Sequence, residues 1–301
     1  MSKVTSGMSK ALIRRETISG YLFMLPSLLF FVGFVIVPMV MCVCTSFTDA
    51  TMSRNHVTSF VGFPNYLRLV SDPIFLKAMK NTFVIVFVSV PVTCIFSLWV
   101  SSVIHKMHGF ATSAYRVIFY LPVVTGSVAV TVVWKWMLDY YGGIFNQVGM
   151  NLGLLDGRIN WLGDPKYALG CIILILLTTS VGQPIVLYVS ALDNVDHSLV
   201  EAAQVDGATD LQVFWKIKWP QIMPTTLYIL VVTTINSFQC FALIQLLTSG
   251  GPDFATSTVM YHIYYTAFQL YDYGYANAMG VILAIFIGIL SAVQFKLGQM
   301  D

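Results

Sequence analysis

The side chains best suited to chemistry in this chain are amides and hydroxyls that lie inside long apolar stretches. Five of them are Thr125, Ser127, Gln183, Asn236 and Gln239. Such groups offer hydrogen bonds without charge, which suits a neutral polar solute. Asn and Gln are costly to bury unpaired, so they favour a polar cavity. The alternative is that these groups only join neighbouring helices, as most Ser and Thr in membrane helices do.

Two of the five residues lie next to residues that break helices. Gln183 is followed by Pro184, and Thr125 lies between Pro122 and Gly126. Such breaks let polar and backbone groups face a water-filled cavity. We therefore expect the five residues to line a path for a solute.

The chain lacks the motifs of common catalytic and nucleotide sites. A phosphate-binding loop needs Gly-x4-Gly-Lys-Ser/Thr, and the sequence contains no Gly-Lys dipeptide. It contains no His-Glu-x-x-His, Cys-x-x-Cys or Gly-x-Ser-x-Gly pattern either. We expect no catalysis, cofactor or metal here, and any ATP that is used would bind another polypeptide. All five cysteines lie in apolar stretches and are predicted to be core residues: Cys42, Cys44, Cys94, Cys171 and Cys240.

The composition indicates a helical membrane protein. Apolar and aromatic residues make up 57% of the 301 residues, and charged residues make up only 10%. A typical soluble domain is about 25% charged. This composition excludes an ordinary soluble enzyme, a disordered chain and a nucleic-acid-binding protein.

The predicted fold is an all-α integral membrane protein, with residues 1–301 forming one transmembrane domain. A span needs about 20 apolar residues. The stretch 254–271 is also uncharged, but its many polar and aromatic residues suit an interfacial or cavity-lining helix better. The six remaining spans lie near 21–45, 81–104, 116–137, 168–191, 226–247 and 275–295.

The basic residues favour an N-terminus in the cytoplasm. Lys3, Lys10, Arg14 and Arg15 precede the first span, which we interpret as an uncleaved helix rather than a secretory signal. The other charges give a weak bias, with nine Lys and Arg inside against seven outside. Because the number of spans is even, both termini are expected in the cytoplasm.

The segment 192–225, between spans four and five, is more than a connector. Ser198 and Glu201 have the spacing of a capping box, and so do Thr209 and Gln212. Two short helices are therefore predicted, lying on the cytoplasmic face as a helix–turn–helix.

Glycine and proline set the limits of these two helices. Gly207 lies between them, where φ > 0 can reverse the chain, and Pro220 and Pro224 are expected to end the second helix. The segment carries five acids against two lysines, so anionic lipid would repel it. It is better suited to docking on another protein.

This segment resembles a cytoplasmic loop in the permease subunits of bacterial binding-protein-dependent ABC importers. The family pattern is Glu-Ala-Ala, three residues, Gly, nine residues, Ile, one residue, Leu-Pro. Here Trp219 replaces the usual Leu, which puts only local packing in doubt. Further segments, among them 62–82, 115–124 and 250–268, are similar to the carbohydrate subgroup, the maltose and glycerol-phosphate importer type. The resemblance implies that seven residues couple the chain to an ATPase: Glu201, Ala202, Ala203, Asp206, Gly207, Ile217 and Pro220.

The resemblance also implies partners and a location. The chain would form half of a pore for a carbohydrate in the bacterial cytoplasmic (inner) membrane. A sister permease would form the other half as a heterodimer, two ATPase subunits would bind ATP, and an extracellular solute-binding protein would deliver the cargo. The alternatives are a glycerol-phosphate or amino-sugar cargo in the same family, or a stand-alone channel.

Three histidines are interpreted without a ligand. His262 lies in an aromatic stretch and is expected to pack at an interface or to form a plain hydrogen bond. His105 and His108 flank Lys106 in a short loop and are expected to be solvated.

Overall fold

The computed structural model describes residues 10–52, 57–107 and 109–298. In these ranges the regular structure is helical, and β-pairing is limited to two isolated bridges. This confirms the predicted all-α class. The helices are α1 (Lys10–Phe31), α2 (Val37–Thr45), α3 (Pro64–Ser71), α4 (Pro73–His105), α5 (Phe110–Thr125), α6 (Ser127–Met137), α7 (Ile144–Asn151), α8 (Pro165–Ser180), α9 (Gly182–Asp193), α10 (His197–Val205), α11 (Asp210–Val213), α12 (Trp219–Phe238), α13 (Ala242–Leu247), α14 (Val259–Phe268) and α15 (Tyr273–Leu297).

Within the described ranges, four helical segments are long and apolar enough to cross a membrane, and two bent pairs, α5 with α6 and α8 with α9, pass the same test together. Counting each bent pair as one crossing gives the six predicted spans in their predicted order. In the stretch 254–271, α14 has only ten residues, which at about 1.5 Å per residue is too short to cross a bilayer. The four single segments are Thr17–Thr45, Pro73–His105, Asp210–Leu247 and Tyr273–Leu297.

The third predicted span, 116–137, is not one helix. α5 ends at Thr125, and α6 leaves it at 97°. Gly126 adopts φ +83° and ψ 144°, which glycine adopts far more readily than other residues, so the helix cannot continue through it. The fourth span bends by 41° between α8 and α9, where Pro184 has no N–H to donate to the carbonyl of Ser180. Breaks in both spans were predicted from the sequence. The 97° turn at Gly126, however, divides the third span into two helices, where one span was predicted.

The prediction that Pro220 and Pro224 end the second helix of the 192–225 loop is wrong. α11 continues through a π-helical turn, Phe214–Lys218, directly into α12. Pro220 is the second residue of α12, and Pro224 lies inside it. A proline is tolerated in the first turn of a helix, and the π-helical turn before it already departs from the i→i−4 pattern. One continuous helical rod therefore joins the loop to the fifth span.

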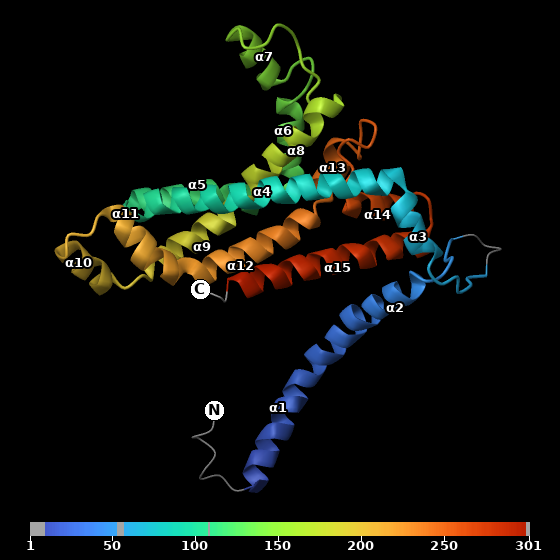
Figure 1. Ribbon diagram of the computed structural model, residues 1–301, viewed down its shortest axis with the longest axis horizontal. Helices are drawn as coiled ribbons and strands as arrows, with labels where there is room; N and C mark the ends of the chain where they lie inside the picture. The colour runs from blue at the N-terminus through green and yellow to red at the C-terminus, as the bar shows by residue number, and fades with distance from the viewer. Residues whose placement is uncertain (1–9, 53–56, 108, 299–301) are drawn as a thin grey trace.

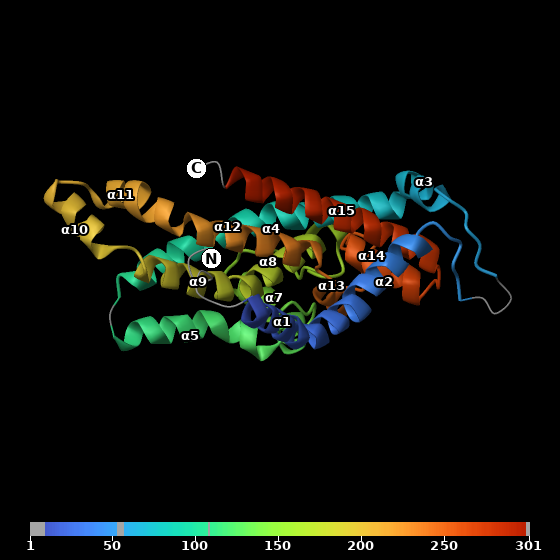
Figure 2. The ribbon, with the colours of Figure 1, turned by 90° about the horizontal axis from the view of Figure 1, so that it is seen from below.

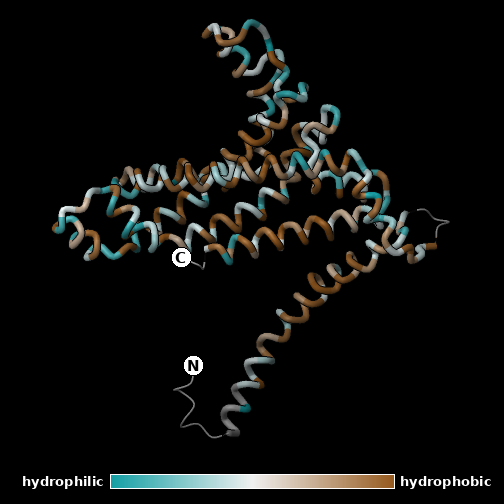
Figure 3. The backbone as a smooth tube through the Cα atoms, in the orientation of Figure 1, coloured by the Kyte–Doolittle hydropathy of each residue, from teal (hydrophilic) through white to brown (hydrophobic). Residues whose placement is uncertain are grey.

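The N-terminal helical segment stands apart from the bundle (Figures 1 and 3). None of the most apolar window of the Thr17–Thr45 span is buried. Its last turns, in α2, pack against α15, where Asn277 accepts a hydrogen bond from Cys42 Sγ at 3.4 Å and donates to Thr45 Oγ1 at 2.6 Å. An apolar surface of this size needs lipid or another subunit to cover it.

The core lies where α4 packs against α9 and α12, and α15 packs against α12; these helices run side by side along the bundle (Figures 1 and 2). Small buried hydroxyl residues on α4 allow close helix contacts. Ser97 donates a hydrogen bond at 3.3 Å to the carbonyl of Val181, in the bend between α8 and α9, and Ser101 donates at 3.0 Å to the carbonyl of Ile185 in α9. All five cysteines are free thiols, and two of them are buried.

A polar network joins the helices at the end of the bundle opposite the 192–225 loop. Asp72 caps α4 and accepts a hydrogen bond from Tyr275 Oη of α15 at 2.7 Å. His262 of α14 is buried, as its predicted packing role requires, and its Nε2 lies 3.8 Å from Asp72 Oδ2. Arg68 of α3 lies over the Tyr275 ring and donates to Asp272 Oδ2 at 2.8 Å. The network fixes α3, α14 and α15 to the start of α4.

Candidate functional site

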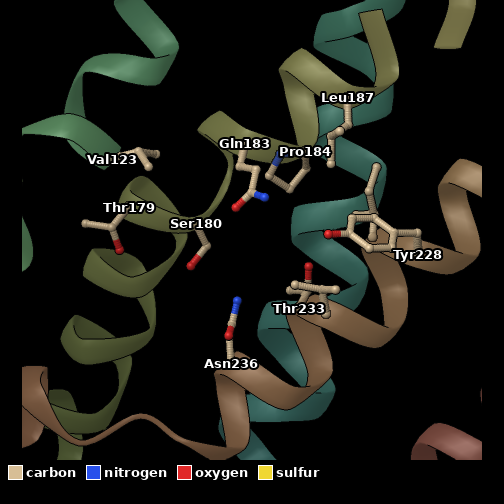
Figure 4. Close-up of a pocket in the computed structure, with 11 residues that line it drawn as sticks. Val123, Thr179, Ser180, Gln183, Pro184, Leu187, Tyr228, Thr233 and Asn236 are labelled. Atoms are coloured by element: carbon tan, nitrogen blue, oxygen red, sulfur yellow. The ribbon is translucent and has the colours of Figure 1, made fainter. Parts of the chain in front are cut away.

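A cavity of about 140 Å³ lies where the bend between α8 and α9 faces α12, with α5 at its side (Figure 4). Amide, hydroxyl and phenol groups alternate with aliphatic side chains around it. None of the described residues that line the cavity is charged. The lining residues are Val123, Thr179, Ser180, Gln183, Pro184, Leu187, Tyr228, Ile229, Val232, Thr233 and Asn236.

Two side-chain amides occupy opposite walls of this cavity (Figure 4). Gln183 is the second residue of α9, directly after the bend, and Asn236 lies near the end of α12. Neither amide hydrogen-bonds to another side chain or backbone group in the described part of the chain. Both are therefore free to bind a solute, and the structure brings these two predicted residues together.

Sequence reasoning missed several polar residues of the lining. Tyr228, Val232 and Asn236 are spaced four residues apart on α12, so they lie on one face of the helix. This spacing from Asn236 could have predicted that Tyr228 lines the cavity. Thr179 Oγ1 donates to the carbonyl of Leu176 at 2.9 Å. Its oxygen keeps lone pairs that can still accept a hydrogen bond from a solute.

Three residues predicted for the same path do not line this cavity. Thr125 donates its hydroxyl to the carbonyl of Leu121 at 2.8 Å, and Ser127 begins α6 beyond the sharp bend. Gln239 follows the last residue of α12. Their place on a solute path stays a prediction.

The first helix of the 192–225 loop, α10, is capped by Asp196. Its Oδ1 accepts hydrogen bonds from the backbone N and Oγ of Ser198, at 2.9 and 2.7 Å. The capping box predicted from Ser198 and Glu201 is therefore wrong, because an aspartate two residues earlier is also a strong cap and comes first. The hydroxyl of Ser198 and then its N–H hold the pKa of Asp196 below its usual value.

The second predicted capping box is confirmed. Thr209 Oγ1 accepts from the backbone N of Gln212 at 3.4 Å, and Gln212 Oε1 accepts from the backbone N of Thr209 at 2.9 Å. Gly207 adopts φ +80° between the two helices, the reversal expected from the sequence. The loop is therefore the predicted helix–turn–helix, with its second helix extended into α12.

Four of the residues predicted to couple to an ATPase lie together. Ala203, Asp206, Gly207 and Ile217 line a hollow of about 300 Å³ between α10 and the π-helical turn. Glu201 is exposed on α10 beside Ala202. Pro220 lies apart from them, in a groove beside α15. Their coupling role stays a prediction.

Large apolar side chains project from this acidic loop. Val205 is 88% exposed, Leu211 is 68% exposed and Trp215 is 55% exposed. Such a surface, interspersed with carboxylates, is typical of a protein–protein contact.

The prediction that His105 is solvated is wrong. Its side chain is only 15% exposed, and its Nδ1 lies 2.8 Å from Asp193 Oδ1. His108 lies outside the described residues.

A membrane bundle with an uncharged polar cavity at broken helices, joined to an exposed helix–turn–helix, defines the membrane-spanning subunit of a transporter. The chain belongs to the family of binding-protein-dependent transport system inner membrane components, whose sequence profile matches residues 67–297.

Relatives with assigned roles match along nearly their whole length. The multiple sugar-binding transport system permease protein MsmF of Streptococcus mutans is 31% identical, over 93% of this chain and 95% of its own. The probable ABC transporter permease protein YesP of Bacillus subtilis is 30% identical, over 94% and 91%. A chain of a solved bacterial ABC transporter that imports alginate superposes with a TM-score of 0.82 at 24% identity, over 96% of this chain and 97% of its own. This last likeness shows the shared fold.

Proposed function

We propose that this chain is one of two permease subunits of an ATP-driven importer for a neutral carbohydrate. It forms half of the pore, and separate ATPase subunits drive it through the 192–225 loop. The chain itself does no chemistry. The cargo path runs past Gln183 and Asn236, with Thr125, Ser127 and Gln239 as further candidates.

The observation that carries the proposal is the lining of the cavity. Sugars present hydroxyl groups that donate and accept hydrogen bonds, and apolar C–H faces that pack on aromatic rings. Gln183 and Asn236 supply both donors and acceptors, and Tyr228 supplies a ring and a phenol group. Relatives named for the transport of several sugars and of lactose support this cargo class.

The cavity also argues against a phosphorylated cargo. A phosphate group is bound by Arg, Lys or several backbone N–H groups. None of the described residues around the cavity is basic. An amino-sugar would similarly lack a carboxylate partner there.

The proposed partners follow from the two exposed surfaces. The 192–225 loop, with Glu201, Asp206 and Gly207, docks in the ATPase subunits, which bind the ATP. The uncovered apolar span Thr17–Thr45 lies against lipid and the sister permease. A solute-binding protein delivers cargo at the opposite, outer end, and both termini lie in the cytoplasm. A solved relative is described with an alginate pentasaccharide-bound periplasmic protein, which supports such a delivery partner.

Co-purification tests the assembly. The chain would carry a C-terminal tag, and native membranes would be solubilised in mild detergent. We expect an ATPase with a phosphate-binding loop and a second permease, with two ATPase copies for each copy of this chain. A chain that purifies alone under the mildest conditions would contradict the importer and favour a stand-alone channel.

A further inference from the structure

Asp193 joins three helices with one carboxylate. Its Oδ1 lies 2.8 Å from Nδ1 of His105, the last residue of α4. Its Oδ2 lies 2.8 Å from Nη2 of Arg116 on α5. Because a carboxylate can only accept, His105 must donate its Nδ1–H, which the neutral ring can do. The charge-assisted bond to Arg116 is the stronger of the two. We call Asp193, His105 and Arg116 the carboxylate clamp.

The position of Asp193 in the chain is as informative as its contacts. It is the last residue of α9, whose other end carries Gln183 in the wall of the cavity. The 192–225 loop leaves α9 at this point through non-helical residues 194–196. The clamp therefore lies between the loop and one wall of the cavity.

The two ends of the loop are attached to the two cavity walls in different ways. At its C-terminal end, the loop continues as one helical rod from Asp210 through α12 to Phe238, and this rod carries Asn236. A movement of the loop must therefore move α12. At its N-terminal end, the loop joins α9 through the short turn after Asp193; α9 packs against α4 and α5 along its length, and the clamp fixes its last residue to both helices.

Direct packing of the loop against the end of α4 is loose. A hollow of about 380 Å³ lies between them, lined on one side by His105 and Lys106 and on the other by Asp210 and Lys218. Lys106 Nζ lies 3.3 Å from Asp210 Oδ2, but these side chains are 70% and 82% exposed. An ion pair this exposed contributes little. The carboxylate clamp is thus the polar contact that ties the end of α9 next to the loop to α4 and α5.

We propose that Asp193 is a positioning residue for transport. By holding α9 to α4 and α5, it keeps the wall with Gln183 in place while the loop moves α12 and Asn236. The distance between the two walls then changes, and the cavity opens or closes. Without the clamp, the end of α9 follows the loop, both walls move together, and ATP hydrolysis proceeds without transport. This inference rests on the proposed function, because it requires a loop that an ATPase moves.

The test uses the complete importer, purified with its co-purifying subunits and reconstituted in liposomes, with solute uptake and ATP hydrolysis measured together. For Asp193→Asn we expect uptake to fall about tenfold while solute-stimulated ATP hydrolysis changes less than twofold. Asp193→Glu keeps the carboxylate and should retain at least half of the uptake. Asp156→Asn, an equal loss of charge in the loop between α7 and α8, should match the wild type.

The variants His105→Leu and Arg116→Leu each remove the donor of one bond of the clamp and leave Asp193 in place. We expect each to raise the ATP used per solute moved by twofold to fivefold, and they provide the test should Asp193→Asn fail to assemble. A parallel loss of uptake and hydrolysis in these variants, or an unchanged ratio, would overturn the inference alone. A wild-type complex without solute-stimulated hydrolysis would instead refute the proposed function.

Discussion

Gln183 and Asn236 point into one cavity from two different helices, and neither amide has a partner of its own in the described protein (Figure 4). A side-chain amide without a hydrogen-bond partner destabilises a membrane bundle unless water or a solute hydrogen-bonds to it. Gln183 is fixed by the bend before Pro184, and Asn236 by its place on α12. The pair therefore marks the point where a polar cargo would be held.

Replacing both amides should remove most of the uptake. Each hydrogen bond to a neutral partner contributes about 0.5–1.5 kcal/mol net, so losing one from each side should lower uptake about tenfold. The variant is Gln183→Leu with Asn236→Leu, measured as uptake of labelled sugar into proteoliposomes.

Gln269 provides the matched control for this experiment. It is an exposed amide at the end of α14, outside the proposed cargo path, and it does not line the cavity. Gln269→Leu should lose far less uptake than the double variant. Equal uptake in the double variant and the wild type would show that the cargo does not pass between these amides.

The sequence predicted this part of the site because the signal is local. Gln183 stands next to Pro184, and both an amide and a helix break are visible without coordinates. Thr179 and Ser180 were harder to assign, since hydroxyls in membrane helices commonly bond to their own backbone. Only the structure shows that they face the cavity, which lies at the 41° bend between α8 and α9.

A substitution at Gly207 should uncouple the loop without unfolding the bundle. Gly207 has φ +80°, and a Cβ there would meet no atom within 4 Å. Gly207→Asp therefore costs only the strain of that backbone conformation, about 1 kcal/mol. However, it places a charged side chain in the hollow shared with Ala203 and Ile217.

We expect Gly207→Asp to reach the membrane at the wild-type level and to lose uptake and the co-purifying ATPase. Membrane level is measured by immunoblot, and ATPase recovery by quantitative mass spectrometry. Gly153→Asp, which also replaces a left-handed glycine in open space, is the control in the outer loop. Normal ATPase recovery and uptake in the Gly207 variant would contradict the docking role.

The course of the helices was predictable only in part, for physical reasons. Gly126 was visible as a break beside Pro122, but a glycine permits many angles, and the 97° turn depends on the packing of α6 against α13. The two prolines at the end of the loop, Pro220 and Pro224, led to the opposite error, because a helix end was predicted where the helix continues. Their usual effect is to stop a helix, yet a π-helical turn before Pro220 lets the helix continue.

Gly182 should tolerate no larger residue. A Cβ at this position would lie 2.4 Å from the carbonyl oxygen of Phe119 and 2.9 Å from Cγ2 of Val123. Gly182→Ala would thus force α9 away from α5, and overpacking of this kind costs about 1–3 kcal/mol. Gly170→Ala, in α8, meets nothing within 4 Å and provides the control.

We expect Gly182→Ala to lower the melting temperature in detergent by several degrees and to reduce uptake, because the cavity wall shifts. Gly170→Ala should leave the melting temperature equal or raise it, since alanine favours a helix over glycine by about 1 kcal/mol. Equal melting temperatures for the Gly182 variant and the wild type would show that α5 and α9 are not in direct backbone contact.

Acid should destabilise the bundle through His262. Burial lowers the pKa of His262 below its usual value of 6.5, although the Asp72 carboxylate nearby opposes this shift. A histidine with a lowered pKa stays neutral in the fold while the unfolded chain binds a proton. Its stabilising contribution is therefore complete above pH 6.5 and is lost as the pH falls through the folded-state pKa.

Protonation of Asp72 also destabilises the fold in acid, but at a lower pH than protonation of His262. Its burial would raise the pKa, but hydrogen bonds from Tyr275, Ile74 and Phe75 outweigh this and hold the pKa below the usual value of 3.8. This contribution is lost only in stronger acid. Between pH 6.5 and 5, His262 should thus account for a slope of at most about 1.4 kcal/mol per pH unit.

Thermal unfolding in detergent, followed by tryptophan fluorescence between pH 7.5 and 5, measures this slope. We expect the melting temperature to fall with pH in the wild type and to change much less in His262→Gln, which cannot titrate. His197→Gln, which replaces an exposed histidine at the start of α10, is the matched control. The same slope in His262→Gln and in the wild type would show that the acid sensitivity arises elsewhere, and that the contact between His262 and Asp72 does not control how α14 is held against α4.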